Sequence, residues 1–305
     1  MLQSHTGQII ALGAAFCWTA TALSFQKATG RVGSLNVNLL RLVIAFVIYA
    51  FISFLLRGMI FPVDAPKHVW IWMSMSGLVG FVFGDFFLFK SFEYISARVS
   101  VLIMALNPPM AAVISWIALG ETLSSRAILA MAVTLTGILM VIAERQNKDS
   151  AKGVKNSFKI KYSLKGILYA FGGAIGQAAG IVISKYGMQD YNVFGATQIR
   201  IIAGSLGFTL IVSLLKRWGN IYSALQDKKT MIFIFTGAVF GPFIGVYLSL
   251  LAVKHTAVGI ASTLMSITPV LIIPPAIFLL KEKVTLKEII GAMVTIAGVA
   301  MFFTG

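Results

Sequence analysis

GFVFG (residues 80–84) and GAVFG (residues 237–241) are near copies of one another, and this duplication decides the fold. Similar blocks repeat on both sides of them. At an offset of 159, Gly7, Gly13 and Arg41 match Gly166, Gly172 and Arg200; at an offset of 161, Pro108, Glu121 and MAVTLTGILM (131–140) match Pro269, Glu282 and AMVTIAGVAM (292–301). The matches keep their order along the chain, so the sequence predicts two similar halves.

Composition places both halves in a membrane. The 305 residues are 58% hydrophobic and 11% charged, with a mean hydropathy of +0.89, whereas soluble domains carry about 25% charged residues. A membrane-spanning helix needs about 20 apolar residues. Ten segments qualify, approximately 8–28, 34–56, 69–90, 97–118, 125–143, 164–185, 194–215, 230–252, 258–280 and 286–304. We expect an all-α integral membrane protein with ten transmembrane helices.

Each half holds five of these helices, and five is odd. The second half must therefore enter the membrane from the opposite side, which makes an inverted repeat of the kind found in secondary transporters. We expect a first five-helix repeat at 1–143, a basic hydrophilic linker at 144–161 and a second repeat at 162–305. A central cavity is expected between them.

The ten-helix pattern resembles the drug/metabolite transporter superfamily, specifically its EamA family. Each half has an Arg early in the second helix (Arg41, Arg200), a Pro in the fourth, an acidic loop (LGETLS, 119–124; LKEKVT, 280–285) and a fifth helix with TLTG or TIAG. The resemblance implies the export or exchange of small metabolites, often amino acids, and leaves the substrate open. One departure is Lys281, where the first half has Gly120.

The distribution of positive charge predicts the orientation. Loops after odd-numbered helices carry 18 of the 25 Lys and Arg, seven of them in 144–165, and loops after even-numbered helices carry 5. The positive-inside rule puts the 144–165 linker in the cytoplasm and both termini outside, in a multi-pass plasma membrane protein, most simply a prokaryotic cytoplasmic membrane. The net charge of +15 therefore indicates contact with anionic lipid headgroups, with no nucleic acid partner.

Prolines mark the candidate transport path. Matched prolines inside the halves of a transporter point to its binding region, because each removes a backbone donor. The candidates for helix breaks or gating are Pro108, Pro109, Pro269, Pro274 and Pro275. Asn107 and Thr268 precede the matched pair and either contact substrate or satisfy the freed carbonyls. A packing kink without a ligand is the alternative.

Trp18 and Gln177 are matched at an offset of 159, near the middle of their helices. A glutamine in the membrane must find a hydrogen-bond partner, either on another helix or on a substrate. Trp18 suits the wall of an apolar site or a packed core. Tyr247, just past Pro242 and Gly245, could point into the same cavity.

Asp85 follows GFVFG directly and lies in an apolar stretch. A charged Asp at mid-helix costs roughly 2.5–3.5 kcal/mol on insertion scales. Lys90, five residues on, is about 140° away round a helix and is a poor partner. Asp85 must therefore face another helix, water or substrate. We predict that it binds a coupling proton or a cationic group of the substrate; the alternative is a helix–helix hydrogen bond.

Other polar residues suggest structural roles. Arg41 and Arg200, within two turns of their helix starts, are expected to extend to the interface. Small residues permit close helix contact, and the glycines of helices 3 and 6 are expected to form packing surfaces: Gly77, Gly80, Gly84, Gly172, Gly173, Gly176 and Gly180. The three histidines and Cys17 are not at ligand spacing, so we expect neither metal nor cofactor.

The sequence favours a secondary transporter of a small metabolite, an exporter that works by alternating access, with protons as a candidate partner. A monomer or weak homodimer is expected. An exchanger of sugar phosphates or nucleotide sugars ranks lower, because Lys90, Lys185 and Lys254 lie at helix ends. A passive facilitator is a further alternative. A membrane-embedded enzyme is remote, since no catalytic constellation is visible. A Walker A motif is absent, so nothing suggests ATP-driven transport.

The orientation can be tested with a cysteine introduced at Ser150 in a Cys17→Ser background. We expect slow reaction with a membrane-impermeant thiol reagent in intact cells and fast reaction in inverted vesicles, because the linker faces the cytoplasm. Fast labelling in intact cells would show that the charge count misleads.

Overall fold

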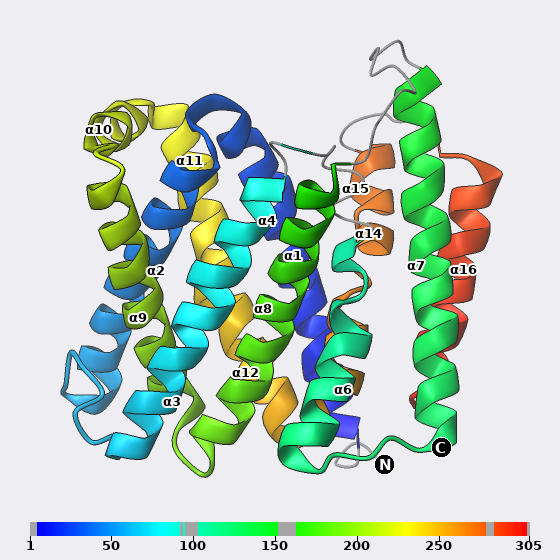
Figure 1. The fold of residues 1–305 in the computed structure, drawn as a ribbon, viewed down its shortest axis with the longest axis horizontal. Coiled ribbons are helices and arrows are strands. Elements are labelled where there is room, and N and C mark those ends of the chain that lie inside the picture. Colours follow the sequence, from blue (N-terminus) through cyan, green and yellow to red (C-terminus); the bar gives the residue numbers. More distant parts are fainter. Residues whose placement is uncertain (1–4, 92–93, 95–102, 152–162, 279–283, 304–305) are drawn as a thin grey trace.

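The computed structural model of the protein describes residues 5–91, 94, 103–151, 163–278 and 284–303, and in these the regular structure is helical (Figure 1). An all-α membrane protein is confirmed for this part of the chain. In order, the helices are α1 (Thr6–Val32), α2 (Ser34–Arg57), α3 (Lys67–Gly77), the π-helical η2 (Leu78–Gly84), α4 (Asp85–Ser91), α6 (Asn107–Leu119), α7 (Ser125–Ala151), α8 (Leu164–Met188), α9 (Val193–Leu214), α10 (Trp218–Gln226), α11 (Lys228–Ala238), the π-helical η3 (Val239–Gly245), α12 (Val246–His255), α13 (Val258–Met265), α14 (Thr268–Leu271), α15 (Ile273–Phe278) and α16 (Leu286–Met301).

Eight of the predicted spans are helices long and apolar enough to cross a membrane within the described ranges. Of the other two, 97–118 is described only in part, as the 13-residue α6, and α16 has 16 residues. The total of ten therefore stays a prediction. Two features were not predicted: α7 runs to Ala151, beyond the expected end at 143, and the short α10 follows α9. The ninth span is broken into α13, α14 and α15, in the region where prolines were predicted to break the helix.

The two π-helical segments correct the register of the repeat. The starts of α3 and α11, of η2 and η3, and of α4 and α12 are all separated by 161 residues. The match of GFVFG with GAVFG at an offset of 157 is therefore wrong by four residues, about one helical turn. Asp85 corresponds to Val246 and not to Pro242. π-Helical turns are rare and frequently occur at functional sites.

Side-chain caps fix where several helices begin. Asn192 accepts a hydrogen bond from the amide of Gly195 at the start of α9. Thr285 and Glu288 form a reciprocal capping box on α16, which satisfies two otherwise unpaired amides. Asp227 caps α11, and its bonds from the hydroxyl and amide of Thr230 hold the pKa of that carboxyl below its usual value.

The halves interlock through glycines. The α3–η2–α4 helix packs on α8, and α11–η3–α12 packs on α1. A Cβ added to Gly180 would lie 2.6 Å from the Cα of Gly80, and one added to Gly176 would lie 2.8 Å from the Cα of Gly84. These contacts confirm the predicted packing surfaces, because only glycine lets the two backbones approach so closely.

The fifth helices of the two halves also pack on each other. Figure 1 shows α7 and α16 running antiparallel at one side of the bundle, on the right of the view. A Cβ on Gly137 would meet Thr295, and a Cβ on Gly298 would meet Thr134, in both cases at 2.4–2.5 Å. The TLTG and TIAG stretches thus face each other in a reciprocal contact.

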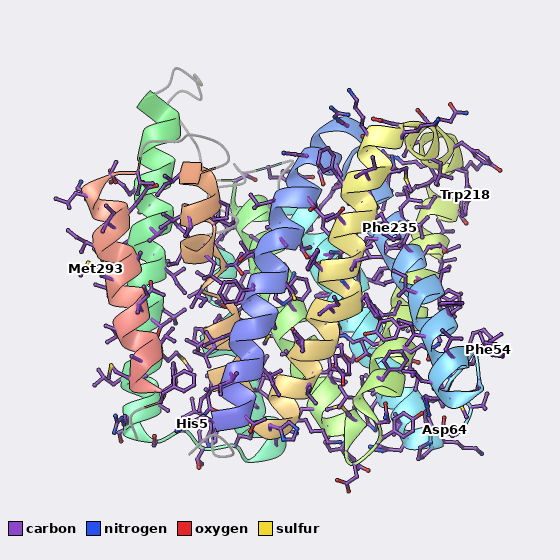
Figure 2. All side chains as sticks on the ribbon, turned by 180° about the vertical axis from the view of Figure 1, so that it is seen from behind. His5, Phe54, Asp64, Trp218, Phe235 and Met293 are labelled. Carbon is purple, nitrogen blue, oxygen red and sulfur yellow. The ribbon has the colours of Figure 1, made fainter. Side chains whose placement is uncertain are left out.

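The outer surface is apolar along the bundle. Large side chains such as Phe54, Phe235 and Met293, labelled in Figure 2, are more than half exposed. Exposed apolar patches this extensive are unusual for a soluble monomer. The surface therefore suits lipid.

Polar contacts join the two halves at one end of the bundle. We call this end the terminal face, because both chain ends and the loop with Asp64 lie there (Figures 1 and 2). Lys185 pairs with Glu121 at 2.5 Å, and Glu121 also accepts from the amide of Val258 at 2.8 Å. Tyr191 donates to Asp64 at 3.0 Å and accepts from Arg57 at 3.2 Å. Burial is the largest cause of the raised pKa of Tyr191.

Candidate functional site

A cavity of about 420 Å³ lies between the two halves. Its lining comes from α1, α2, η2, α4 and α6 of the first half and from α8, α9, α12 and α13 of the second. Most of the lining is apolar, with a few convergent polar and charged groups. Ligand sites have this character and are typically about 300–1,000 Å³.

Asp85 is the first residue of α4, directly after η2, and is 7% exposed. Arg41 on α2 forms an ion pair with it, and Gln177 on α8 donates its amide to the other carboxylate oxygen at 3.2 Å. The carboxylate is therefore held by one residue from its own half and one from the other.

Arg200 on α9 lines the same cavity and is 6% exposed. Its Nη1 donates to the hydroxyl of Ser184 at 2.9 Å, and its guanidinium carbon lies 4.7 Å from the centroid of the Phe81 ring. Its buried Nε has no hydrogen-bond partner within the described structure. Asp85 attracts Arg200 electrostatically without pairing with it directly.

Corresponding positions of the two repeats meet in this lining. At the offsets of 159 and 161, the matched lining pairs are Trp18 with Gln177, Ala22 with Ile181, Arg41 with Arg200, Asp85 with Val246, Leu88 with Ser249, and Met104 with Met265. The cavity is therefore lined by corresponding positions of the two halves. Its one charge asymmetry among these pairs is a carboxylate at 85 opposite an isopropyl group at 246.

Other polar groups complete the wall. Trp18 donates its indole N–H to the hydroxyl of Ser249 at 3.2 Å, a second contact between the halves. Asn107 lines the cavity at the start of α6. The hydroxyl of Ser262 is buried and has no partner among the described atoms. Buried polar groups without partners are costly, so this hydroxyl is an unsatisfied group in the wall of the site.

Four of the predicted substrate-binding residues line the cavity: Trp18, Asp85, Asn107 and Gln177. In the described lining, Tyr247 and Thr268 do not take part. Tyr247 instead packs near the ring of Phe194, with centroids 6.4 Å apart. Thr268 donates to the carbonyl of Met265 at 3.3 Å.

The predicted prolines also lie outside the described lining. Pro108 and Pro109 stand in the first turn of α6, and Pro269 in the first turn of α14, where a missing amide costs nothing. A two-residue turn precedes each of these helices, at 105–106 before α6 and at 266–267 before α14, and interrupts the span. Pro274 and Pro275 lie in α15. The prolines thus restart broken helices, and their gating role stays a prediction.

The expectation that Arg41 and Arg200 reach the interface is wrong. Both guanidinium groups line the cavity. The sequence contained a signal for this, since the two arginines are matched between the halves and Asp85, in its apolar stretch, needs a cation.

No group of three or more His, Cys, Asp or Glu residues in the described part of the chain is placed to hold a metal ion. Arg41, Asp85 and Arg200 supply charge, and Trp18, Gln177 and the serines supply hydrogen bonds. This arrangement can bind and release a polar group.

Comparisons with known proteins agree with this picture. The model of the EamA-like transporter family matches residues 5–143 and 164–304. An uncharacterized transporter of Clostridium kluyveri is 21% identical over 74% of this chain and 70% of its own length. A crystal structure of a protein with 20% identity superposes with a TM-score of 0.79 over 97% of this chain and 96% of that one.

Two eukaryotic relatives are longer. An uncharacterized membrane protein of Saccharomyces cerevisiae is 24% identical over 58% of this chain, and human solute carrier family 35 member G1 is 24% identical over 55%. The matched regions cover 45% and 46% of those proteins, so the alignments span about half their length.

The ion pair can be tested by a double-mutant cycle. Arg41→Met leaves the Asp85 carboxylate buried without its cation, which should lower the free energy of unfolding by about 3–5 kcal/mol. Adding Asp85→Asn should restore most of this loss. Unfolding in detergent micelles measures both, and Lys287→Met, which removes an exposed pair at 3.8 Å, is the control. If Arg41→Met lowered the free energy of unfolding no more than Lys287→Met does, a buried ion pair would be contradicted.

Proposed function

Since the chain belongs to the EamA-like transporter family, we propose that it is a secondary transporter that moves a small metabolite across the membrane by alternating access. The observation that carries the proposal is the cavity between the halves, with the Arg41–Asp85 pair in its wall. An amino acid or a related compound is the substrate class that the family resemblance favours.

Alternation follows from ten helices in two inverted five-helix repeats. The matched lining pairs and the antiparallel packing of α7 on α16 support this arrangement. Exchange of conformations between two similar halves would open the same cavity to either side. The glycine contacts between α8 and η2 supply the smooth surface that such a movement needs.

The contacts of the terminal face form one gate of this cycle. Lys185–Glu121 and the Arg57–Tyr191–Asp64 cluster each join the first half to the second. Opening towards that side would require both to separate. With the termini outside, as the positive charges suggest, this is the outer gate of an exporter in the cytoplasmic membrane.

Asp85 is the proposed coupling residue. The charged and polar groups that face it are Arg41 on α2, Gln177 on α8 and, at longer range, Arg200 on α9; Lys90 shares its helix. Protonation would neutralise the carboxylate and free the Arg41 guanidinium. A proton would thereby change both the charge of the cavity and the contact between α2 and α4.

An exchanger of sugar phosphates or nucleotide sugars is a second candidate. It ranked lower because the sequence offered no cation deep in the membrane, and the positions of Arg41 and Arg200 remove that objection. Because guanidinium groups bind phosphate well, phosphorylated compounds belong in a substrate panel.

Asp85→Asn tests the coupling. In proteoliposomes with a radiolabelled metabolite panel, we expect a pH gradient to stimulate transport by the native protein and not by this variant, because the amide cannot carry the proton. Exchange of substrate for substrate without net proton movement should survive. Asp190→Asn, which removes an exposed carboxylate between α8 and α9, is the matched control. Unaltered pH dependence in Asp85→Asn would reject the proposed coupling role.

A further inference from the structure

We propose that the cavity binds the carboxylate of a small organic monoanion on Arg200. This carboxylate would take the role in the second half that Asp85 has beside Arg41 in the first, because the residue that corresponds to Asp85 is Val246. The inference deepens the proposed transport function and rests on it. It names the charge and the chemical class of the substrate at the site already described.

The first support is the charge of the cavity. The described lining holds two guanidinium groups and one carboxylate, and these three groups sum to a net charge of +1 when Asp85 is ionised. Arg41 has Asp85 as its direct partner, whereas the contacts of the Arg200 guanidinium among the described residues are the hydroxyl of Ser184 and the face of Phe81. A buried charge without a counter-charge is strongly unfavourable. One negative charge in the cavity would offset it.

The second support is the broken symmetry of the lining. Arg41 and Arg200 correspond, and so do Asp85 and Val246. In the first half the arginine meets a carboxylate from the third helix. In the second half the equivalent position is the apolar Val246, so the second arginine has no such partner. A substrate carboxylate on Arg200 would reproduce the pair that the first half makes internally.

Free donors also lie in this wall. The Nε atoms of Arg41 and Arg200 and the hydroxyl of Ser262 are buried and unpartnered within the described residues, and all three residues line the cavity. A carboxylate accepts hydrogen bonds at several lone pairs, and bonds from an ionised donor are roughly twice as strong as neutral ones. Three unpartnered donors on residues of the described lining suit such an acceptor.

The rest of the lining describes the remainder of the ligand. Trp18, Phe81, Leu88, Ile181 and Met265 surround the charged groups with apolar surface. This favours an apolar or aromatic body over a sugar. A phosphate monoester carries about −1.5 to −2 charges at pH 7 and exceeds the single positive charge to be balanced. An amphipathic monocarboxylate fits both the charge and the surface.

Four phenyl probes of different charge test the inference by equilibrium binding to the full-length protein in lipid nanodiscs. They are phenylacetate, its neutral amide phenylacetamide, the cation phenethylammonium and the dianion phenyl phosphate. We expect phenylacetate to bind about tenfold or more tightly than the amide, because the amide lacks the charge-assisted bond. The cation should bind most weakly.

Variants locate the carboxylate. Arg200→Met should abolish the preference for phenylacetate over phenylacetamide, and Arg200→Lys should keep part of it. Val246→Asp should give Arg200 an internal partner and weaken phenylacetate binding at least tenfold, whereas Val246→Asn should weaken it less. Arg126→Met, which removes an exposed arginine on α7, should leave binding unchanged. The ratio of the two ligands on one folded sample corrects for partial loss of protein.

Equal binding of phenylacetate and phenylacetamide to the native protein would overturn the inference. An unchanged preference in a folded Arg200→Met or Arg200→Lys variant would do the same. Tighter binding of phenyl phosphate than of phenylacetate would overturn the monocarboxylate assignment. These measurements need no transport, so loss of the carboxylate preference with intact proton-coupled transport would refute this inference alone. Carboxylate binding without coupled transport would refute the proposed function alone.

Discussion

The ion pair between Arg41 and Asp85 is the contact on which the cavity depends. A carboxylate inside a membrane protein needs a cation and hydrogen bonds, because lipid and apolar side chains do not solvate its charge. Arg41 supplies the cation from α2, and Gln177 supplies an amide from the other half. The carboxylate of Asp85 is thus held by a cation from its own half and by a hydrogen bond from the other half. Any movement of the halves has to adjust the contacts of this one carboxylate.

Duplication explains the shape of the cavity, and departures from duplication explain its charge. Six pairs of corresponding residues belong to the lining, and most are uncharged on both sides. The arginines are kept in both halves, and the aspartate is present in only one. A symmetric site would balance its charges internally. Among the described lining residues, this site therefore has one positive charge more than its carboxylate balances.

Much of the fold could be predicted, because apolar length and a repeated order of motifs survive in the sequence. The register of the third and eighth helices could not. GFVFG and GAVFG are alike in composition, and a shift of four residues leaves the apolar face of a helix nearly unchanged. The π-helical segments, which reveal the true offset, have no clear sequence signal. Tyr247 lies outside the described lining because its neighbour Val246 lines the cavity, and the next residue of a helix points about 100° away. Its part in substrate binding stays a prediction.

The site was predicted in part. Trp18, Gln177, Asn107 and Asp85 are polar or amphipathic groups in apolar helices, and such residues are conspicuous. Arg41 was misjudged because its distance from the helix start says how far its side chain could extend, not which partner it finds. That partner lies on another helix, and the sequence does not specify which helices meet.

Accessibility of the cavity to water and substrate tests the account most directly. A cysteine at Ser266, in the lining, is compared in a Cys17→Ser background with a cysteine at Ser53, which is 0% exposed and outside the described lining. The account predicts that a small water-soluble thiol reagent modifies the cysteine at 266, that a transported substrate slows this reaction, and that the cysteine at 53 is inert. Equal rates at 266 with and without substrate, in a protein that still transports, would show that the substrate path lies elsewhere.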